Sequence, residues 1–320
     1  INTRSFGEDP VKVADKVIAY ASGLESGKVL SVCKHFPGHG DTDVDSHKAL
    51  PVLPFTRERL DSVELYPFKE AIRAGVSGIG HLQVPVIEPI GDLPSSLSRN
   101  VVYGLLTEEL AFKGLIFTDA LAMKGVAGNK SVCLQALQAG NDMVLAPRRL
   151  KEEMDAVLEA VEKGELPEEE INAKCRKVLT YKYILGLERK PFVKLSGLGT
   201  RINTPQTRDL ISRLNLAAIT VLNNKNDVLP LHPDLKEAAI LNVGKPEEIE
   251  PFDRKMKKYT SFARFQLRKD LPEAEQQKLR DSLAAYRRVI VTVTEQRLAS
   301  YQSFFAKFAP ESPVIYVFYT

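Results

Sequence analysis

The stretch KVLSVCKHFPGHGDTDVDSH, residues Lys28–His47, begins with a short apolar, β-rich run and ends in a polar loop. The loop holds three of the chain's five histidines and three aspartates, with two glycines among them. The first half is typical of a buried strand, and the second half follows the point where that strand would end. Three kinds of loop fit this composition: a metal site, a proton-transfer device, or a polar loop that only stabilises itself.

The same order, an apolar strand followed by polar residues, recurs three times further along the chain. These runs are VSGIGHLQVP at 76–85, GLIFTDA at 114–120 and NDMVLAP at 141–147. Helical periodicity lies between and around them, at 11–24, 57–74, 98–112, 131–139 and 150–187. Apolar strands that alternate with helices predict a parallel sheet. Polar residues at the ends of successive strands are typical of a (β/α)8 TIM barrel, of which these four units would form the C-terminal half. A four-stranded open α/β sheet is the alternative.

We expect three regions in the chain: a half-barrel at 1–190, a linker at 191–205 and a second domain at 206–320. The linker contains Pro and Gly and has little periodicity. In the second domain, apolar runs at 218–222, 238–243, 289–293 and 314–318 alternate with helical segments at 206–216, 273–286 and 299–308. This alternation predicts an α/β-sandwich with an open parallel sheet. The domain has no glycine-rich phosphate-binding motif, so no nucleotide site is indicated.

Composition excludes several classes of partner. The net charge is only +3, with basic residues spread along the chain, so no nucleic acid partner is expected. The three cysteines lie far apart, which argues against a disulfide framework and against a Cys-rich zinc site. No apolar run approaches the ~20 residues that a membrane span needs. The chain opens at Ile1 rather than Met and closes on an apolar run, so we expect a fragment with a truncated second domain and no visible signal region.

Asp119 and the pair Asp45 and His47 are the candidate catalytic residues. Asp119 follows an apolar run, and a carboxylate at the end of a buried strand can act as nucleophile or general base. Its alternative role is to cap the following helix. Asp45 and His47 are two residues apart, so in an extended stretch both side chains point to one side. The carboxylate would hold an imidazole whose ordinary pKa, ~6.5, suits acid–base catalysis, although a surface pair is the alternative.

Lys34 and His35 end the first strand and are candidate binding residues. Lys34 would place a cation at the pocket mouth, where it can bind hydroxyls or an anion, although a Lys that merely extends to solvent is the alternative. His39 lies between Gly38 and Gly40, a position that favours fixing the loop. The loop has enough ligands for a metal, but their spacing matches no zinc template such as HExxH. We therefore expect no metal and no cofactor.

KHFPGHGDTDVDSH resembles the signature of glycoside hydrolase family 3, specifically its bacterial β-N-acetylglucosaminidase (β-hexosaminidase) branch. NTRSFGEDP, GIGHLQVP, GLIFTDALAMKGV and AGNDMVLAP follow the order in which that family carries similar motifs. The resemblance covers roughly residues 1–190, and AAITVLNNKNDVLPL is similar to the opening of the family's second, α/β-sandwich domain.

The resemblance implies a role for each matching residue. Asp119 corresponds to the catalytic nucleophile, His47 to the acid/base and Asp45 to its partner in an Asp-His dyad. Lys34 and His35 match a sugar-binding pair, and Arg4, in NTRSFG, matches an arginine that contacts the same sugar. Because the loop with His47 is present, we expect the second domain to supply no acid/base.

The function implied is a retaining exo-β-N-acetylglucosaminidase that acts on terminal β-linked N-acetylglucosamine, with peptidoglycan fragments (muropeptides) as expected substrates. The family barrel also needs four earlier strands, so we expect the parent protein to supply a missing N-terminal half-barrel. A bacterial cytoplasmic or periplasmic location fits equally well. The alternatives are a β-glucosidase or glycoside phosphorylase of the same family, a metal-dependent hydrolase, or an inactive carbohydrate-binding protein.

Overall fold

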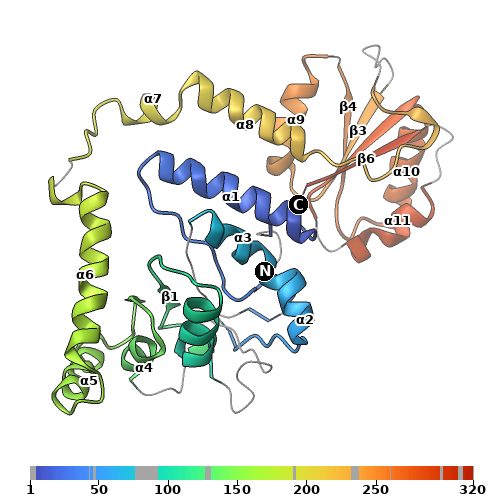
Figure 1. Cartoon of the computed structure of the whole chain (residues 1–320). Coiled ribbons are helices and arrows are strands. Elements are labelled where there is room, and N and C mark those ends of the chain that lie inside the picture. The colour runs from blue at the N-terminus through green and yellow to red at the C-terminus, as the bar shows by residue number, and fades with distance from the viewer. Residues whose placement is uncertain are drawn as a thin grey trace. The chain divides into compact units, whose positions relative to one another are not determined.

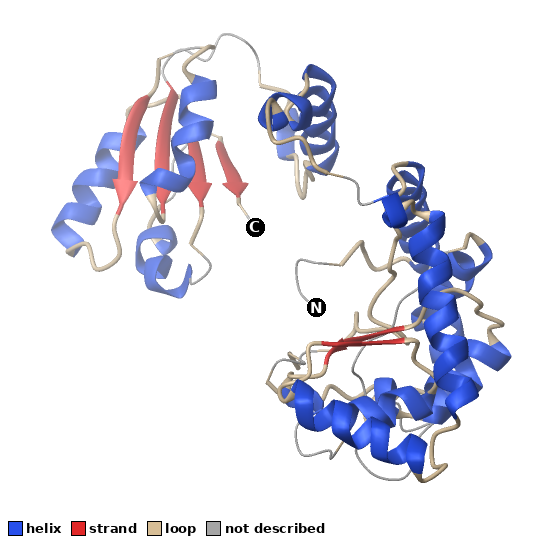
Figure 2. Cartoon of the chain, turned by 90° about the vertical axis from the view of Figure 1, so that its left-hand side faces the viewer, coloured by secondary structure: helices blue, strands red, loops and turns tan. Residues whose placement is uncertain are grey.

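The computed structural model describes residues 5–42, 44–45, 48–75, 93–126, 131–189, 192–231, 238–259, 261–295, 298–308 and 313–319. The chain divides into two compact units, Ile1–Lys194 and Leu195–Thr320. Both are built from helices and parallel strands (Figures 1 and 2). The expected α/β class is therefore confirmed.

The first unit begins with helix α1 (Pro10–Ser26), which packs against α3 (Tyr66–Arg73). Asp9 caps α1 by accepting hydrogen bonds from the backbone amides of Val11 and Lys12. Ala21 of α1 and Ala71 of α3 are both buried in one apolar cluster, and their small side chains allow close helix contact. The short helices α2 (Arg57–Arg59) and η2 (Leu60–Glu64) lead into α3.

The sheet described in the first unit consists of two parallel strands, β1 (Phe117–Ala120) and β2 (Met143–Leu145). Its register pairs Phe117 with Met143 and Ala120 with Leu145. Thr118 is buried, and its hydroxyl oxygen accepts a hydrogen bond from the Leu145 amide at 3.0 Å. This bond fixes the register beside the residue that follows, Asp119.

The other helices of the first unit precede and follow this strand pair along the chain. In chain order they are η3 (Ser95–Leu97), η4 (Asn100–Glu109), η5 (Lys124–Val126), α4 (Val132–Ala139), α5 (Leu150–Glu162), α6 (Glu168–Ile184) and η6 (Leu187–Arg189). One apolar core is formed by residues of η2, η4, the loops and the segment directly before β1. In this core Phe36, Leu60, Val101 and Ile116 are almost fully buried. Gly164, at φ 73°, lies in the turn between α5 and α6.

The run expected as the first strand, 28–36, does not form a regular strand. Of these residues only Val32 lies in a β-bridge. A strand requires a neighbour with which to share backbone hydrogen bonds. The next expected strand, at 76–85, lies outside the described residues.

The second unit contains a four-stranded parallel sheet in the order β4-β3-β5-β6 (Figure 2). Its strands are β3 (Ala238–Val243), β4 (Ala263–Leu267), β5 (Arg288–Val293) and β6 (Val314–Phe318). The helices are α7 (Leu198–Ile202), α8 (Pro205–Ala218), η7 (Lys225–Asp227), α9 (Pro246–Met256), α10 (Glu273–Ala284), η8 (Leu298–Tyr301) and α11 (Gln302–Ala306). Strand β3 is buried throughout, which explains its unbroken apolar sequence.

Several elements of the second unit differ from the sequence prediction. Residues 218–222 were expected as a strand, but Ile219, Val221 and Leu222 lie in an exposed irregular segment. Helix α9 and edge strand β4 were not predicted. Helix α9 carries Pro251 inside it, and β4 alternates apolar residues with Arg264 and Gln266, so neither has a strong sequence signal.

Across the described ranges, we find no helix that combines the length and the apolar composition of a membrane span.

Candidate active site

Asp119 lies in strand β1, directly after the buried residues Leu115, Ile116 and Thr118. Its side chain is 21% exposed. One carboxylate oxygen, Oδ1, accepts a hydrogen bond from the amide of Ala120 at 2.9 Å. The nearest following helix, η5, begins only at Lys124, so Asp119 does not cap a helix. The capping alternative is therefore wrong.

His35 is the closest ionisable neighbour of Asp119 that the structure gives. Its Nε2 lies 3.2 Å from Oδ2 of Asp119, and the imidazole is only 8% exposed. The interaction with His35 is the main cause that holds the pKa of Asp119 well below its usual range. The Ala120 amide and the charge of Lys34 act in the same direction, against the opposing effect of burial. Asp119 is thus an anion at any pH near neutrality.

The backbone around His35 is held by the core below it. Phe36 is fully buried and packs edge-to-face on Phe68, with ring centroids 5.2 Å apart. The carbonyl of His35 accepts hydrogen bonds from the amides of Gly38 and His39. These contacts fix where the imidazole can point.

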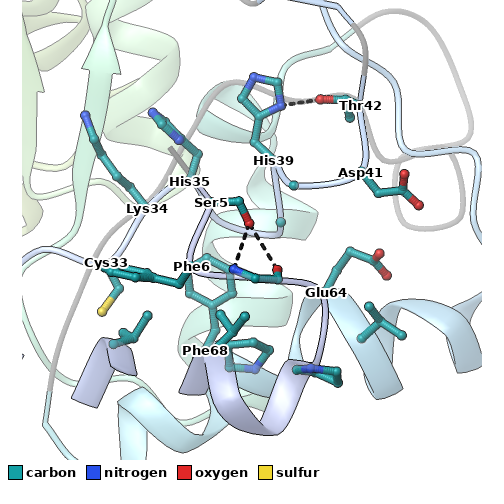
Figure 3. Close-up of a pocket in the computed structure, with 18 of the residues that line it drawn as sticks. Ser5, Phe6, Cys33, Lys34, His35, His39, Asp41, Thr42, Glu64 and Phe68 are labelled. Carbon is teal, nitrogen blue, oxygen red and sulfur yellow. Dashed lines mark hydrogen bonds between the residues drawn. The ribbon is translucent and has the colours of Figure 1, made fainter. Parts of the chain in front are cut away.

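The loop that follows is fastened at two further points. Nδ1 of His39 and the hydroxyl of Thr42 are hydrogen-bonded at 2.6 Å, a contact drawn in Figure 3. Arg59 bridges two carboxylates, Asp41 on the loop and the buried Glu64 at the end of η2, each at 3.0 Å. The interpretation of His39 as a residue that fixes the loop agrees with this geometry.

Gly38 is required at its position for steric reasons. Its φ is 143°, and a Cβ built there would lie 2.6 Å from Cβ of Glu64. We expect Gly38→Ala to lower the free energy of unfolding by roughly 1–3 kcal/mol, because the clash adds to backbone strain. Gly40→Ala is the matched control, since Gly40 has open space and no left-handed φ. Thermal unfolding of the two variants tests this, and equal melting temperatures would contradict it.

A pocket of 1120 Å³ opens beside this loop. One wall is apolar and comes from α1, where Val13, Val17 and Leu24 line it. Lys34 and His35 are among its polar lining residues, and Figure 3 shows their side chains extending in the same direction. Asp119 is not among the lining residues, but His35 lines the pocket and contacts Asp119, so the candidate site lies beside His35.

The structure brings three of the six predicted site residues together: Asp119, His35 and Lys34. Asp45 is exposed, and its carbonyl accepts hydrogen bonds from the amides of Lys48 and Ala49. His47 and Arg4 lie outside the described residues. Among the residues that are described, no group of three or more His, Cys, Asp or Glu side chains is arranged to hold a metal.

Sequence reasoning missed Arg59 and Glu64. Arg59 is 18 residues from Asp41 in the chain, and no local spacing rule connects the two. Glu64 ends a helical segment on which it reads as one more surface acid, yet its side chain is only 4% exposed. Only the folded arrangement reveals the bridge, which raises the pKa of Arg59 chiefly through Glu64.

The sequence pattern described as "Glycosyl hydrolase family 3 N terminal domain" matches residues 1–181, more than half of the chain. The chain belongs to glycosyl hydrolase family 3. The resemblance inferred from the sequence motifs is thus confirmed. Strand β1 with Asp119, β2 and the loop after His35 all lie within the matched region.

Relatives and solved structures extend the likeness. Beta-hexosaminidase A of Pseudoalteromonas piscicida is 32% identical over 255 residues, 72% of this chain and 42% of that protein. A beta-hexosaminidase of Nitrosospira multiformis is 39% identical over 150 residues, 45% of this chain and 42% of the relative. The structure of a family 3 beta-N-acetylglucosaminidase from Paenibacillus sp. FPU-7 has a TM-score of 0.79 at 30% identity, over 98% of this chain and 63% of that one. The chain spans less than half the length of these two curated relatives.

Proposed function

We propose that the full-length protein is a retaining exo-β-N-acetylglucosaminidase with Asp119 as nucleophile. The observation that carries the proposal is the state of Asp119, an anionic carboxylate that directly follows the buried Thr118 and lies beside a buried imidazole. Relatives named beta-hexosaminidase support the substrate class. The proposal includes the first unit as the C-terminal half of a (β/α)8 barrel, and terminal β-linked N-acetylglucosamine of peptidoglycan fragments as the natural substrate.

The reaction requires two steps at the anomeric carbon. In the first, an oxygen of Asp119 bonds to that carbon while the bond to the leaving oxygen breaks, and His47 gives that oxygen its proton. In the second, His47 removes a proton from water, whose oxygen displaces Asp119 and regenerates the carboxylate. Asp45 would orient the imidazole and stabilise its protonated form. Each proton and electron pair is accounted for without a cofactor.

Lys34 and Arg4 would bind hydroxyls of the terminal sugar. Lys34 is exposed and lines the pocket, so its ammonium can donate hydrogen bonds there. Its positive charge also favours the ionised form of Asp119. Lys34 would therefore both bind the terminal sugar and favour the ionised form of the nucleophile.

A covalent trap tests the proposal. The full-length protein would be incubated with a fluorinated N-acetylglucosaminyl fluoride, digested with trypsin and analysed by peptide mass. Cleavage after Lys113 and Lys124 releases GLIFTDALAMK, in which Asp119 is the only side-chain carboxylate. A sugar adduct on this peptide supports the proposal. The absence of any adduct, together with no turnover of an aryl N-acetylglucosaminide, would refute it.

Substrate choice is tested separately. We expect the aryl N-acetylglucosaminide to be cleaved faster than the matching aryl glucoside, and without added phosphate. A preference for glucoside would indicate a β-glucosidase, and dependence on phosphate would indicate a phosphorylase. Loss of activity with a chelator would indicate a metal-dependent hydrolase.

A further inference from the structure

Both oxygens of the Asp119 carboxylate have identified partners. Oδ1 accepts the backbone amide of Ala120 at 2.9 Å, and Oδ2 lies 3.2 Å from Nε2 of His35. The first partner is the next residue on the same strand, so it moves together with Asp119. The second comes from a segment more than 80 positions earlier in the chain and provides an independent reference point.

The imidazole of His35 is firmly placed. It is 8% exposed, stands edge-on to the ring of His39 with centroids 5.7 Å apart, and follows a backbone anchored by the buried Phe36. Its other nitrogen, Nδ1, is buried and has no hydrogen-bond partner in the part of the chain that the structure describes. Among the described residues, the polar contact of this ring is therefore directed at Asp119.

We propose that His35 is a positioning residue for Asp119: its Nε2–H donates to Oδ2 and holds the carboxylate oriented and ionised for attack on the anomeric carbon. Donation requires the tautomer that carries the proton on Nε2. In that tautomer the buried Nδ1 carries no proton and needs no hydrogen-bond acceptor. This rests on the proposed role of Asp119 as nucleophile. It assigns His35 a task that differs from the binding of sugar hydroxyls.

The charge environment of Asp119 makes the role measurable. The groups on other segments that act on it among the described residues are His35 and Lys34. Burial raises the pKa of Asp119, and His35 provides the largest opposing effect. The nucleophile must be ionised, so the native protein keeps it reactive down to low pH. Removing His35 allows burial to raise that pKa toward or above the ordinary ~3.9.

Two matched variants separate positioning from packing. His35→Gln can place an amide N–H near the position of Nε2, whereas the shorter His35→Asn places its amide near Nδ1 and does not reach Asp119. The rate of covalent labelling by the fluorinated N-acetylglucosaminyl fluoride would be measured from pH 3.5 to 8 with the full-length protein. Fluoride leaves without help from an acid, so the rate reports on the nucleophile.

We expect His35→Asn to label roughly 10- to 100-fold more slowly than the native protein at pH 7. Its rate should fall further as the pH drops through ~4, while the native protein and His35→Gln show no such fall there. Equal rates and equal pH profiles for the Gln and Asn variants would overturn the proposal. An unchanged pH profile of labelling with only a higher KM would also overturn it, because that is the result expected from sugar binding alone.

The outcome is distinguishable from failure of the proposed function. If the native protein forms no adduct, the glycosidase proposal fails, and ¹³C titration of the Asp119 carboxyl then tests the contact directly. A carboxyl that titrates at the same pH in the native protein and in His35→Asn would overturn the role of His35. If either variant fails to fold, the same titration on the folded one is compared with the native protein.

Discussion

Asp119→Ala is expected to lower the turnover of an aryl N-acetylglucosaminide by roughly 10⁴-fold or more, because it removes the atom that would bond to the anomeric carbon. The variant also removes the contacts of the carboxylate with the Ala120 amide and with Nε2 of the buried His35. We therefore expect a modest drop in the thermal unfolding temperature, with the protein still folded at the assay temperature. Initial rates at saturating substrate, corrected for folded protein, measure the effect.

Asp142 provides the matched control for this variant. It lies beside β2, accepts a hydrogen bond from the Ile116 amide at 2.8 Å and pairs with Lys177 at 2.6 Å. Asp142→Asn keeps an acceptor for the amide and loses only the ion pair, so it should reduce stability and leave the rate per folded molecule near native. If it abolished turnover as Asp119→Ala does, displacement of the strands rather than loss of a nucleophile would explain both.

Much of the fold is predictable from the sequence because the central strands β3 and β5 are buried almost throughout and the other predicted strands also follow apolar runs. Strands β1, β2, β3, β5 and β6 all coincide with apolar runs, and the break between α5 and α6 coincides with Gly164. The same rule fails at 28–36 and 218–222. These runs have strand composition, but apart from the single β-bridge at Val32 no strand pairs with them in the described part of the chain, and composition cannot report a partner.

The site is only partly predictable. A carboxylate directly after a buried apolar run marks Asp119 as a candidate site residue, because the carboxyl ends of barrel strands are where such residues lie. The contact with His35 depends on how two distant segments meet, and the bridge from Arg59 to Asp41 depends on the path of the loop. Local patterns therefore find the candidate groups, whereas the folded chain determines which of them touch.

His47→Ala is expected to slow the cleavage of poor leaving groups by roughly 10²- to 10⁴-fold, the usual contribution of a general acid. A disaccharide's leaving oxygen needs a proton as the bond breaks, whereas an activated nitrophenolate leaves as an anion. The same variant should therefore lose no more than about tenfold in kcat/KM on a dinitrophenyl N-acetylglucosaminide, since this parameter reports the first step. Comparing kcat/KM over a series of aryl leaving groups gives the measurement.

His39→Asn is the control within the same loop. Asn can replace Nδ1 of His39 as the partner of Thr42, so the loop keeps its fastening while one imidazole is lost. Its dependence on leaving group should match that of the native protein. Equal losses of His47→Ala on good and poor leaving groups would contradict the acid role, because a residue that only shapes the loop affects every substrate alike. A steep dependence confined to His47→Ala would instead assign the proton to that imidazole and leave Asp119 as the nucleophile common to both substrate classes.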